Sequence, residues 1–233
     1  MGYRATYRTH GYVRKGRSVR TRRAPGMHLE KLLSSEGAQV IAGVDEVGVG
    51  AWAGPVVVGA VVMDPSHRLY KVRDSKLLDA PRRAWLAERV RAGALAWGVG
   101  MSWPSEIDVE GLSEAIRRAA RRAIGSLGMT PDACLVDGNW NFVGDGAKTV
   151  VKGDCESVSI ASASVVAKVF RDGLMTQMSS LYPGYRFELN KGYPSPVHKW
   201  GLRALGPSPL HRKLFAPVQR HFDEGTPGRL LTP

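Results

Sequence analysis

Apolar runs bounded by turn residues predict an α/β protein. Valine- and alanine-rich runs typical of strands lie at residues 40–44, 56–63, 94–101, 133–136 and 149–151. Helical spacing or helix-capping residues predict helices at residues 79–93, 110–127, 159–180 and 197–205, with short ones after Met27 and His211. The breaker Trp52-Ala53-Gly54-Pro55 favours a hairpin between the first two strands. Antiparallel strands first, then alternating strands and helices, indicate a mixed sheet flanked by helices.

The two ends of the chain differ from this body. Residues 1–26 carry eight basic side chains, no acidic one and no hydrophobic period. Three interpretations stay open: a basic disordered arm that binds nucleic acid, an Arg-rich organellar presequence, or a start codon set upstream of Met27. We favour the mis-set start or a dispensable tail. Residues 27–222 are then one domain with a small helical C-terminal part from about residue 183, and 223–233 a flexible tail.

The charge of the chain points to an anionic partner. The formal net charge is +12, which favours nucleic acid or a membrane surface, although eight of these charges precede residue 27. The longest uncharged run, 47–63, is shorter than a membrane span and is broken by glycine and proline, and no apolar leader is present. With only two cysteines, a disulfide framework or a cysteine-rich zinc site is excluded. We therefore expect a cytoplasmic protein with reduced thiols.

One predicted helix, 110–127, has a strongly basic face. Its apolar positions recur at helical spacing and leave one row of outward side chains, Arg117, Arg118, Arg121 and Arg122. We interpret this row as a solvated surface rather than as a direct contact with nucleic acid.

Acidic residues follow three of the predicted strands. Asp45 and Glu46 end the first, while Asp137 and Asp154 follow later ones. Strand ends gather at one edge of an α/β sheet, so these four carboxylates can converge. Adjacent carboxylates repel each other unless a cation neutralises them, and oxygen-only ligands suit Mg²⁺ or Mn²⁺. Asp137 and Asp154 taken singly are ordinary turn residues; together with the acidic pair they favour a metal site.

Seven motifs, in order, carry a resemblance to a known family. They are Gly43-Val44-Asp45-Glu46-Val47-Gly48, Gly54-Pro55-Val56-Val57, Asp74-Ser75-Lys76, Val136-Asp137-Gly138-Asn139, Val151-Lys152-Gly153-Asp154, Ala163-Ser164-Val165-Val166-Ala167-Lys168-Val169-Phe170-Arg171-Asp172 and Lys191-Gly192-Tyr193. Over about residues 38–220 the chain resembles ribonuclease HII, the type 2 ribonuclease H family.

The resemblance implies a fold, an activity and a partner. The expected fold is RNase H-like, and the expected activity is endonucleolytic cleavage of RNA in RNA–DNA hybrids. Incision 5′ of a single ribonucleotide embedded in duplex DNA, leaving a 3′-hydroxyl, is expected as well. Mg²⁺ or Mn²⁺, two ions in the reacting complex, would be held by the four carboxylates Asp45, Glu46, Asp137 and Asp154. We expect a monomer that needs no membrane.

The resemblance also implies substrate-reading residues. The glycine turn Gly48-Val49-Gly50 and Tyr193 would read the ribose 2′-hydroxyl at the RNA–DNA junction, with backbone amides of Gly48 and Gly50 as donors. Lys76, Ser164 and Lys168 would hold phosphates.

Three positions depart from the family pattern. Val49 replaces the arginine of the glycine turn, Leu77 a second lysine, and Asn190 the histidine before Lys-Gly-Tyr. A hybrid-binding protein with weakened or lost catalysis therefore stays an alternative, as does a related metal-dependent nuclease for another structured nucleic acid, which Tyr193 disfavours. The isolated histidines His198, His211 and His221 have acid–base or phosphate binding as open alternatives, but we interpret them as surface residues.

Overall fold

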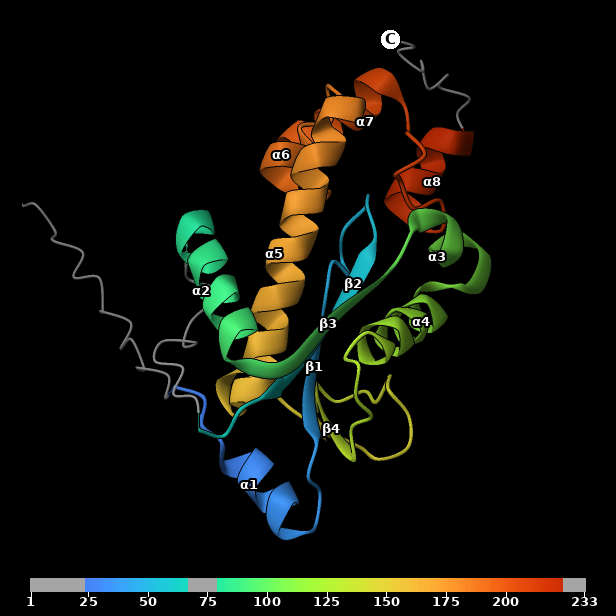
Figure 1. Cartoon of the computed structure of the whole chain (residues 1–233). Coiled ribbons are helices and arrows are strands. Elements are labelled where there is room, and N and C mark those ends of the chain that lie inside the picture. Colours follow the sequence, from blue (N-terminus) through green and yellow to red (C-terminus); the bar gives the residue numbers. More distant parts are fainter. Residues whose placement is uncertain (1–23, 67–78, 224–233) are drawn as a thin grey trace, which may run out of the picture.

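The computed structural model describes residues 24–66 and 79–223, and a five-stranded mixed sheet lies at its centre (Figure 1). Its strands are β1 Ile41–Val47, β2 Val56–Met63, β3 Ala94–Ser102, β4 Ala133–Asp137 and β5 Ala147–Val150. The spatial order is β3-β2-β1-β4-β5. β1, β2 and β3 pair antiparallel, whereas β1, β4 and β5 run parallel. The predicted hairpin and the mixed sheet are confirmed.

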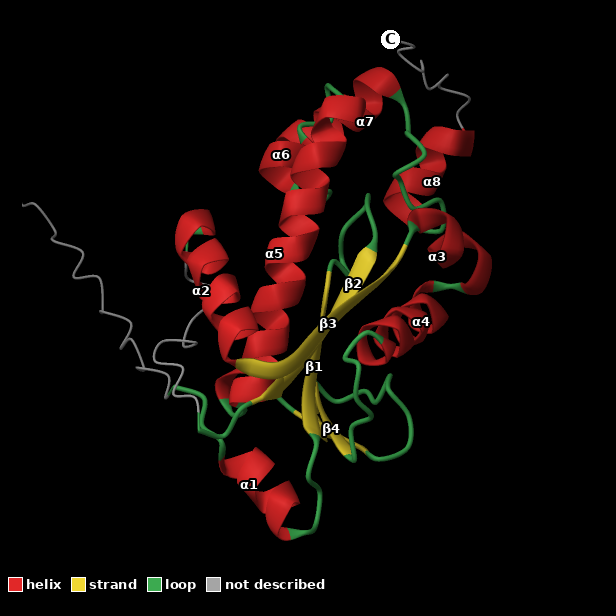
Figure 2. Cartoon of the chain, in the orientation of Figure 1, coloured by secondary structure: helices red, strands yellow, loops and turns green. Residues whose placement is uncertain are grey.

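Helices cover both faces of the sheet (Figures 1 and 2). The helices of the described residues are α1 His28–Ser35, α2 Ala80–Gly93, α3 Pro104–Glu110, α4 Leu112–Gly125, α5 Val158–Leu181, α6 Phe187–Asn190, α7 Pro196–Leu205 and α8 Ala216–Asp223. α4 packs on β2 and β3, while α5 packs on β1 and β2 from the other side, with α2 against α5. The C-terminal helices α6 and α7 lie at the far end of α5, whereas α8 lies next to α3 (Figure 1).

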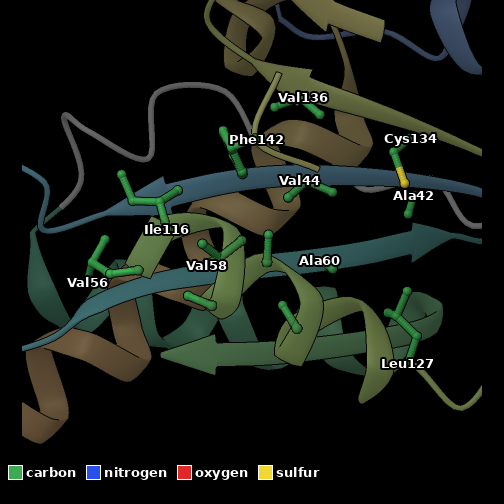
Figure 3. Close-up of a cluster of buried hydrophobic side chains, with 14 of the residues drawn as sticks. Ala42, Val44, Val56, Val58, Ala60, Ile116, Leu127, Cys134, Val136 and Phe142 are labelled. Atoms are coloured by element: carbon green, nitrogen blue, oxygen red, sulfur yellow. The ribbon is translucent and has the colours of Figure 1, made fainter. Parts of the chain in front are cut away.

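The middle strand β2 explains the layered core. All of its residues are buried, and alternate side chains point to opposite faces. Val56, Val58 and Ala60 belong to the cluster under α4, which includes Ile116 (Figure 3). Val61 lies on the α5 side. An apolar run without alternation is what a strand covered on both faces requires.

The helix α5 lies unusually close to the strand that ends in the acidic pair. A Cβ added to Gly43 of β1 would stand 2.1 Å from the backbone carbon of Ser159 in α5. Only glycine allows this approach.

Most predicted element boundaries hold within a few residues, and two short helices were missed. Asp79 caps α2 by accepting a hydrogen bond from the Arg82 amide at 3.0 Å. The helix expected from residue 110 begins instead at Leu112, because Gly111 adopts φ +81° and separates it from α3. Neither α3 nor α6 was predicted, since each is too short to establish a helical period.

The expectations about membrane spans and free cysteines can be compared with the structure over the described residues. No helix within 24–66 or 79–223 is long and apolar enough to cross a membrane. Both cysteines are free thiols, and burial raises the pKa of Cys134 to about 11, which makes it a poor nucleophile. The proposed N-terminal arm up to residue 23, the tail after 223, and the positions Lys76 and Leu77 lie outside the described residues.

Candidate active site

A pocket of about 440 Å³ opens at the edge where β1 and β4 end. Its wall consists of Asp45, Glu46, Val47, Gly48, Val49, Gly50, Arg83, Asp137, Ser164, Lys168 and Tyr193. The structure therefore brings together residues that are far apart in the sequence: the acidic pair, the glycine turn, the α5 residues and the tyrosine.

Parallel pairing of β1 and β4 places the first three acids at one edge. Val44 pairs with Val136, so Asp45 and Asp137 follow at the same level. Asp45 is only 5% exposed, and its Oδ1 accepts the amide of Glu46 at 2.8 Å. Asp137 is half-buried and accepts the Gly153 amide at 2.7 Å. These contacts fix Asp137 against the loop that carries the fourth acid.

Asp154 is carried by the loop that Asp137 contacts. It lies in a 3-10 turn, Gly153–Cys155, one residue beyond the amide that Asp137 accepts, and does not belong to the pocket wall. Lys152, which precedes this turn, adopts a left-handed backbone with φ 57°. Across residues 24–66 and 79–223, no three Asp, Glu, His or Cys side chains are grouped as a metal site. By donor type the four acids nevertheless fit a hard divalent ion, and the like charges of Asp45, Glu46 and Asp137 in one pocket wall favour one.

The glycine turn after β1 is held from behind by Arg212. This arginine donates to the carbonyls of Gly48 at 2.7 Å, Val49 at 2.9 Å and Gly54 at 3.0 Å. In a trans peptide the carbonyl and the following N–H point in opposite directions. With two carbonyls turned inward, the amides of Val49 and Gly50 turn outward, and neither donates to an acceptor among the described residues. The turn thus offers two N–H donors to the pocket.

A second arginine, Arg171 of α5, joins the segment that follows this turn to the loop that carries the tyrosine. It donates to the carbonyls of Ala53 at 3.1 Å, Pro55 at 2.9 Å and Lys191 at 2.9 Å. Gly48 has φ +89°, and a Cβ there would lie 2.2 Å from the Arg171 Nε. Any side chain at this position would displace the arginine.

Both arginines are fully buried, and each donates three hydrogen bonds to backbone carbonyls. Burial lowers the pKa of Arg212 to about 9, with the neighbouring charge of Arg171 acting in the same direction. Burial lowers the pKa of Arg171 as well. A buried charge without hydrogen bonds is very unfavourable, so the carbonyls and the guanidinium groups hold one another in place.

Tyr193 is positioned by a compact turn after α6. Asn190 donates to the carbonyls of Tyr185 at 2.7 Å and Arg186 at 2.8 Å, and accepts the Gly192 amide at 2.8 Å. The tyrosine ring lies 5.7 Å from the Lys168 ammonium and 5.4 Å from the Arg171 guanidinium carbon, within the range of cation–π attraction. The departure at Asn190 therefore has a structural role in the tyrosine loop.

The prediction that His198 and His211 are surface residues is wrong. Their exposures are 0% and 1%, in an aromatic cluster with Tyr185 and Phe187. Polar flanking residues suggested a surface position, but tertiary hydrogen bonds allow these rings to be buried. His221 is half-buried and lines a different pocket.

The two buried histidines form a directional chain of hydrogen bonds to the tyrosine loop. The Ser208 amide donates to His211 Nδ1 at 2.9 Å, so the proton of the neutral ring is on Nε2. His211 Nε2 then donates to His198 Nε2 at 3.1 Å, and His198 Nδ1 donates to the Tyr193 carbonyl at 2.9 Å. Burial lowers the pKa of His198, and lowers that of His211 to about 3. Both rings are therefore neutral at ordinary pH.

Sequence reasoning missed Arg83 as a pocket residue. Arg83 of α2 and Lys168 of α5 both contact Asp172, at 3.5 Å and 2.8 Å. Ser164, Lys168 and Arg171 lie at helical spacing on one side of α5. This spacing could have predicted that Arg171 faces the same interior site as the other two. Nothing in the sequence pairs α2 with this site, because the packing of α2 on α5 is tertiary.

Solved structures with the same architecture define the class of protein. Ribonuclease H2 from Pyrococcus horikoshii OT3 superimposes with a TM-score of 0.68 at 25% identity, over 80% of this chain and 98% of that one. RNase HII in a complex with PCNA from Archaeoglobus fulgidus gives a TM-score of 0.64 at 25% identity, over 76% of this chain and 95% of that one. The mixed sheet with its flanking helices is therefore an RNase H-like fold.

Sequence comparison defines the family. The family model described as ribonuclease HII matches residues 42–221. Ribonuclease HII of Caulobacter vibrioides is 47% identical over 184 residues, 78% of this chain and 87% of that protein. Ribonuclease HII of Thermus thermophilus is 46% identical over 179 residues, 77% of this chain and 87% of that protein.

The chain belongs to the ribonuclease HII family. It is accordingly a ribonuclease H, an endoribonuclease that degrades RNA in RNA–DNA hybrids and depends on a divalent metal ion. The recognition of the family and the expected fold are both confirmed.

Proposed function

We propose that this ribonuclease H also incises duplex DNA 5′ of a single embedded ribonucleotide, leaving a 3′-hydroxyl. The observation that carries the proposal is the pair of outward amides of Val49 and Gly50 in the same pocket wall as Asp45 and Tyr193. A site that contacts one 2′-hydroxyl needs only one ribose, whereas a reader of the hybrid shape would need many.

Asp45, Glu46, Asp137 and Asp154 would hold two divalent ions, either Mg²⁺ or Mn²⁺. When bound, such ions activate a water molecule and neutralise charge that develops on the phosphate and the leaving oxygen. Asp45 and Asp137 offer their carboxylates from the ends of neighbouring strands, and Glu46 extends the same wall. The Gly153 amide orients Asp137 and links it to the turn that carries Asp154.

The recognition half of the pocket would bind the ribose. The amides of Val49 and Gly50 supply donors to a 2′-hydroxyl oxygen, and the Tyr193 ring closes the opposite side of the sugar. Because Arg212 orders the turn before substrate arrives, little conformational entropy is lost on binding. The geometry favours Val49 and Gly50 as donors over the Gly48 amide expected from the sequence.

The basic residues of the pocket would hold the scissile region by its phosphates. Lys168, Arg83 and Ser164 provide two cations and a hydroxyl beside the acids. Asp172 contacts both cations and fixes their direction. Lys76 is proposed for the same task by its motif position alone.

The alternative of a decayed, hybrid-binding protein draws on Val49, Leu77 and Asn190. Val49 keeps its backbone role, because its carbonyl accepts from Arg212 and its amide faces outward. Asn190 supports the tyrosine loop. Since all four acids persist as well, we favour an active enzyme with a weakened hold on its substrate.

A nicking assay tests the proposal. A labelled duplex with one ribonucleotide is incubated with Mg²⁺ or Mn²⁺, beside an all-DNA duplex and a long RNA–DNA hybrid. We expect incision of the first at the 5′ side of the ribonucleotide, cleavage of the hybrid, and no cleavage of DNA. Cleavage of the hybrid without incision at the single ribonucleotide would overturn the proposal, while binding without any turnover would favour the decayed alternative.

A further inference from the structure

Glu30 of α1 is a buried carboxylate outside the candidate pocket. The residue is only 5% exposed, and Figure 1 shows α1 below the start of α5. Its Oε1 accepts the Ser157 hydroxyl at 2.6 Å and the Ser159 amide at 3.0 Å. Its Oε2 is buried as well, and no hydrogen-bond donor reaches it from residues 24–66 or 79–223. A carboxylate with one oxygen satisfied and the other not is unfavourable to bury.

The attachment of α1 to the sheet does not require this charge. Leu33 on the same helix is buried in an apolar cluster with Ile41 and Ile160. An apolar side chain at position 30 would allow the same packing without the desolvation of a carboxylate. The carboxylate is therefore explained by what it does on the side of α5, where the positive end of the helix dipole favours an acid.

The hydrogen bonds of Glu30 lead to the turn that carries Asp154. Ser157 is the N-cap of α5, and its amide donates to the Gly153 carbonyl at 2.8 Å. The Gly153 amide in turn donates to Asp137 at 2.7 Å. Glu30 and Asp137 therefore hold the two ends of one short segment, and Asp154 lies within it.

The backbone before α1 binds the same segment. The Gly26 amide donates to the Glu156 carbonyl at 3.2 Å, and the Gly26 carbonyl accepts the Val158 amide at 3.2 Å. These backbone bonds and the side-chain bonds of Glu30 reach four consecutive residues, 156–159. The chain directly after Asp154 is thus fixed from the side of α1.

We propose that Glu30 is a positioning residue that holds Asp154 in place for metal binding. The inference rests on the proposed function, in which Asp154 is one of four acids that hold the ions. Like charges oppose the approach of a fourth carboxylate, so a loose turn would lie away from the site part of the time. The apparent Kd of a ligand is the intrinsic Kd divided by the fraction of protein that is competent to bind. Glu30 raises this fraction without taking part in the reaction.

The metal affinity of the free protein is the direct test. Calorimetric titration with Mn²⁺, in the absence of nucleic acid, compares the wild type with Glu30→Leu and Glu30→Gln. Glu30→Leu removes the acceptor and should raise the apparent Kd by about 3- to 10-fold, whereas Glu30→Gln keeps an oxygen for both donors and should stay within about 2-fold of the wild type. Turnover of a long RNA–DNA hybrid at saturating Mn²⁺ should be unchanged in both variants, because the occupied site is complete.

Two controls separate positioning from general loosening. Glu36→Gln removes the carboxylate that contacts Lys148 at 2.7 Å, at the end of α1, and should leave the Kd unchanged. Val90→Ala creates a cavity under α2 and lowers stability away from the turn, so its Kd should be unchanged as well. If Glu30→Leu does not fold, Ser157→Ala removes one of the two donors and should still raise the Kd. A Kd equal to that of Val90→Ala, or Glu30→Gln as weak as Glu30→Leu, would overturn the proposal.

A double-mutant cycle shows whether Glu30 acts through Asp154. Asp154→Asn alone should weaken Mn²⁺ binding, and addition of Glu30→Leu should weaken it no further. Additive effects would overturn the inference.

The same measurements separate this inference from the proposed function. Weaker binding in Asp154→Asn with wild-type affinity in Glu30→Leu would overturn the inference alone, whereas unchanged affinity in Asp154→Asn would overturn both the four-acid metal set and the inference. A raised Kd in Glu30→Leu with no incision of the single-ribonucleotide duplex by the wild type would support the role of Glu30 and overturn the proposed incision.

Discussion

The two halves of the candidate pocket are built on opposite principles. The acidic half, Asp45 with Asp137 at neighbouring strand ends, gathers like charges that oppose one another. The recognition half, the turn after β1 and the tyrosine loop, is held by two buried arginines whose N–H groups are bonded to carbonyls. The fold alone completes the second half, whereas we propose that the first is stabilised by bound divalent ions. Variants should therefore affect stability and activity in opposite ways in the two halves.

The largest effect is expected for Asp45→Asn. Turnover should fall by at least about 10³-fold, since loss of even one charge-stabilising donor costs about 10²–10³-fold. Stability in metal-free buffer should stay equal or rise, because a repelling charge is removed while the carbonyl oxygen still accepts the Glu46 amide. Nicking rates and chemical denaturation measure the two quantities. A marked loss of stability would show that the acidic half is structural.

The opposite result is expected for Arg212→Met. Three carbonyls lose their donor, so the free energy of unfolding should fall by about 2–4 kcal/mol, less whatever is gained by removing a buried charge. Arg212→Lys, which keeps the charge but cannot span three carbonyls, should raise KM for the single-ribonucleotide duplex more than it lowers kcat. Arg121→Met on α4 is the control and should change neither quantity. If KM is unaffected in the lysine variant, Arg212 does not position the turn.

Acid should loosen the recognition half before the acidic half. The folded-state pKa of His211 is about 3, below the ordinary value of 6.5, so the unfolded chain binds protons first as pH falls. Stability is complete above about pH 6.5 and is lost below it, by up to about 1.4 kcal/mol per pH unit for this histidine. His198 adds to the loss in the same direction, and the charges of His198 and His221 also oppose protonation of His211.

Denaturation curves between pH 7.5 and 5 measure this loss in a range where most carboxylates stay ionised. Asn at position 211 retains a donor but no titratable ring, so His211→Asn should flatten the pH slope even if its stability at pH 7.5 is lower. An unchanged slope would contradict the neutral-histidine chain.

Divalent ions should stabilise the wild type through the acidic half only. At ten times their Kd they raise the free energy of unfolding by about 1.4 kcal/mol. Asp45→Asn should lose this increment and Arg212→Lys should keep it. Melting temperatures with EDTA and with Mg²⁺ or Mn²⁺ make the comparison, and an equal increment in Asp45→Asn would place the ions elsewhere.

The smallest effect is expected for Val49→Arg. The side chain restores a cation beside the scissile region without changing the backbone bonds of the turn, so we expect about 3- to 10-fold tighter binding of the single-ribonucleotide duplex. Val49→Gln is the uncharged control of similar length and should bind as the wild type does. Unchanged affinity in Val49→Arg would contradict the claim that the missing arginine weakens substrate binding.

The sequence predicted the sheet and the pocket edge because those depend on local patterns. Continuous apolar runs marked the strands, helical spacing and capping residues marked the long helices, and acids after strand ends were expected to meet at one edge. It failed where burial contradicts polarity. Arg171, Arg212, His198 and His211 are interior residues because distant carbonyls and amides satisfy them, and such partners are set by tertiary contacts. The position of Asp154 depends on a left-handed residue, Lys152, that no period signals.

The contact between Gly43 and α5 fixes the rotation of the helix relative to the strand, because the two backbones touch directly. No side chain lies between their backbones at this point, so no side chain can adjust its conformation if the helix rotates about its axis. One residue inserted near Ser159 would turn the rest of α5 by about 100° relative to β1. Ser164 and Lys168 would then leave the pocket while Asp45 stayed in it. Substitutions within this helix can be tolerated singly, but its length up to Lys168 cannot drift during evolution.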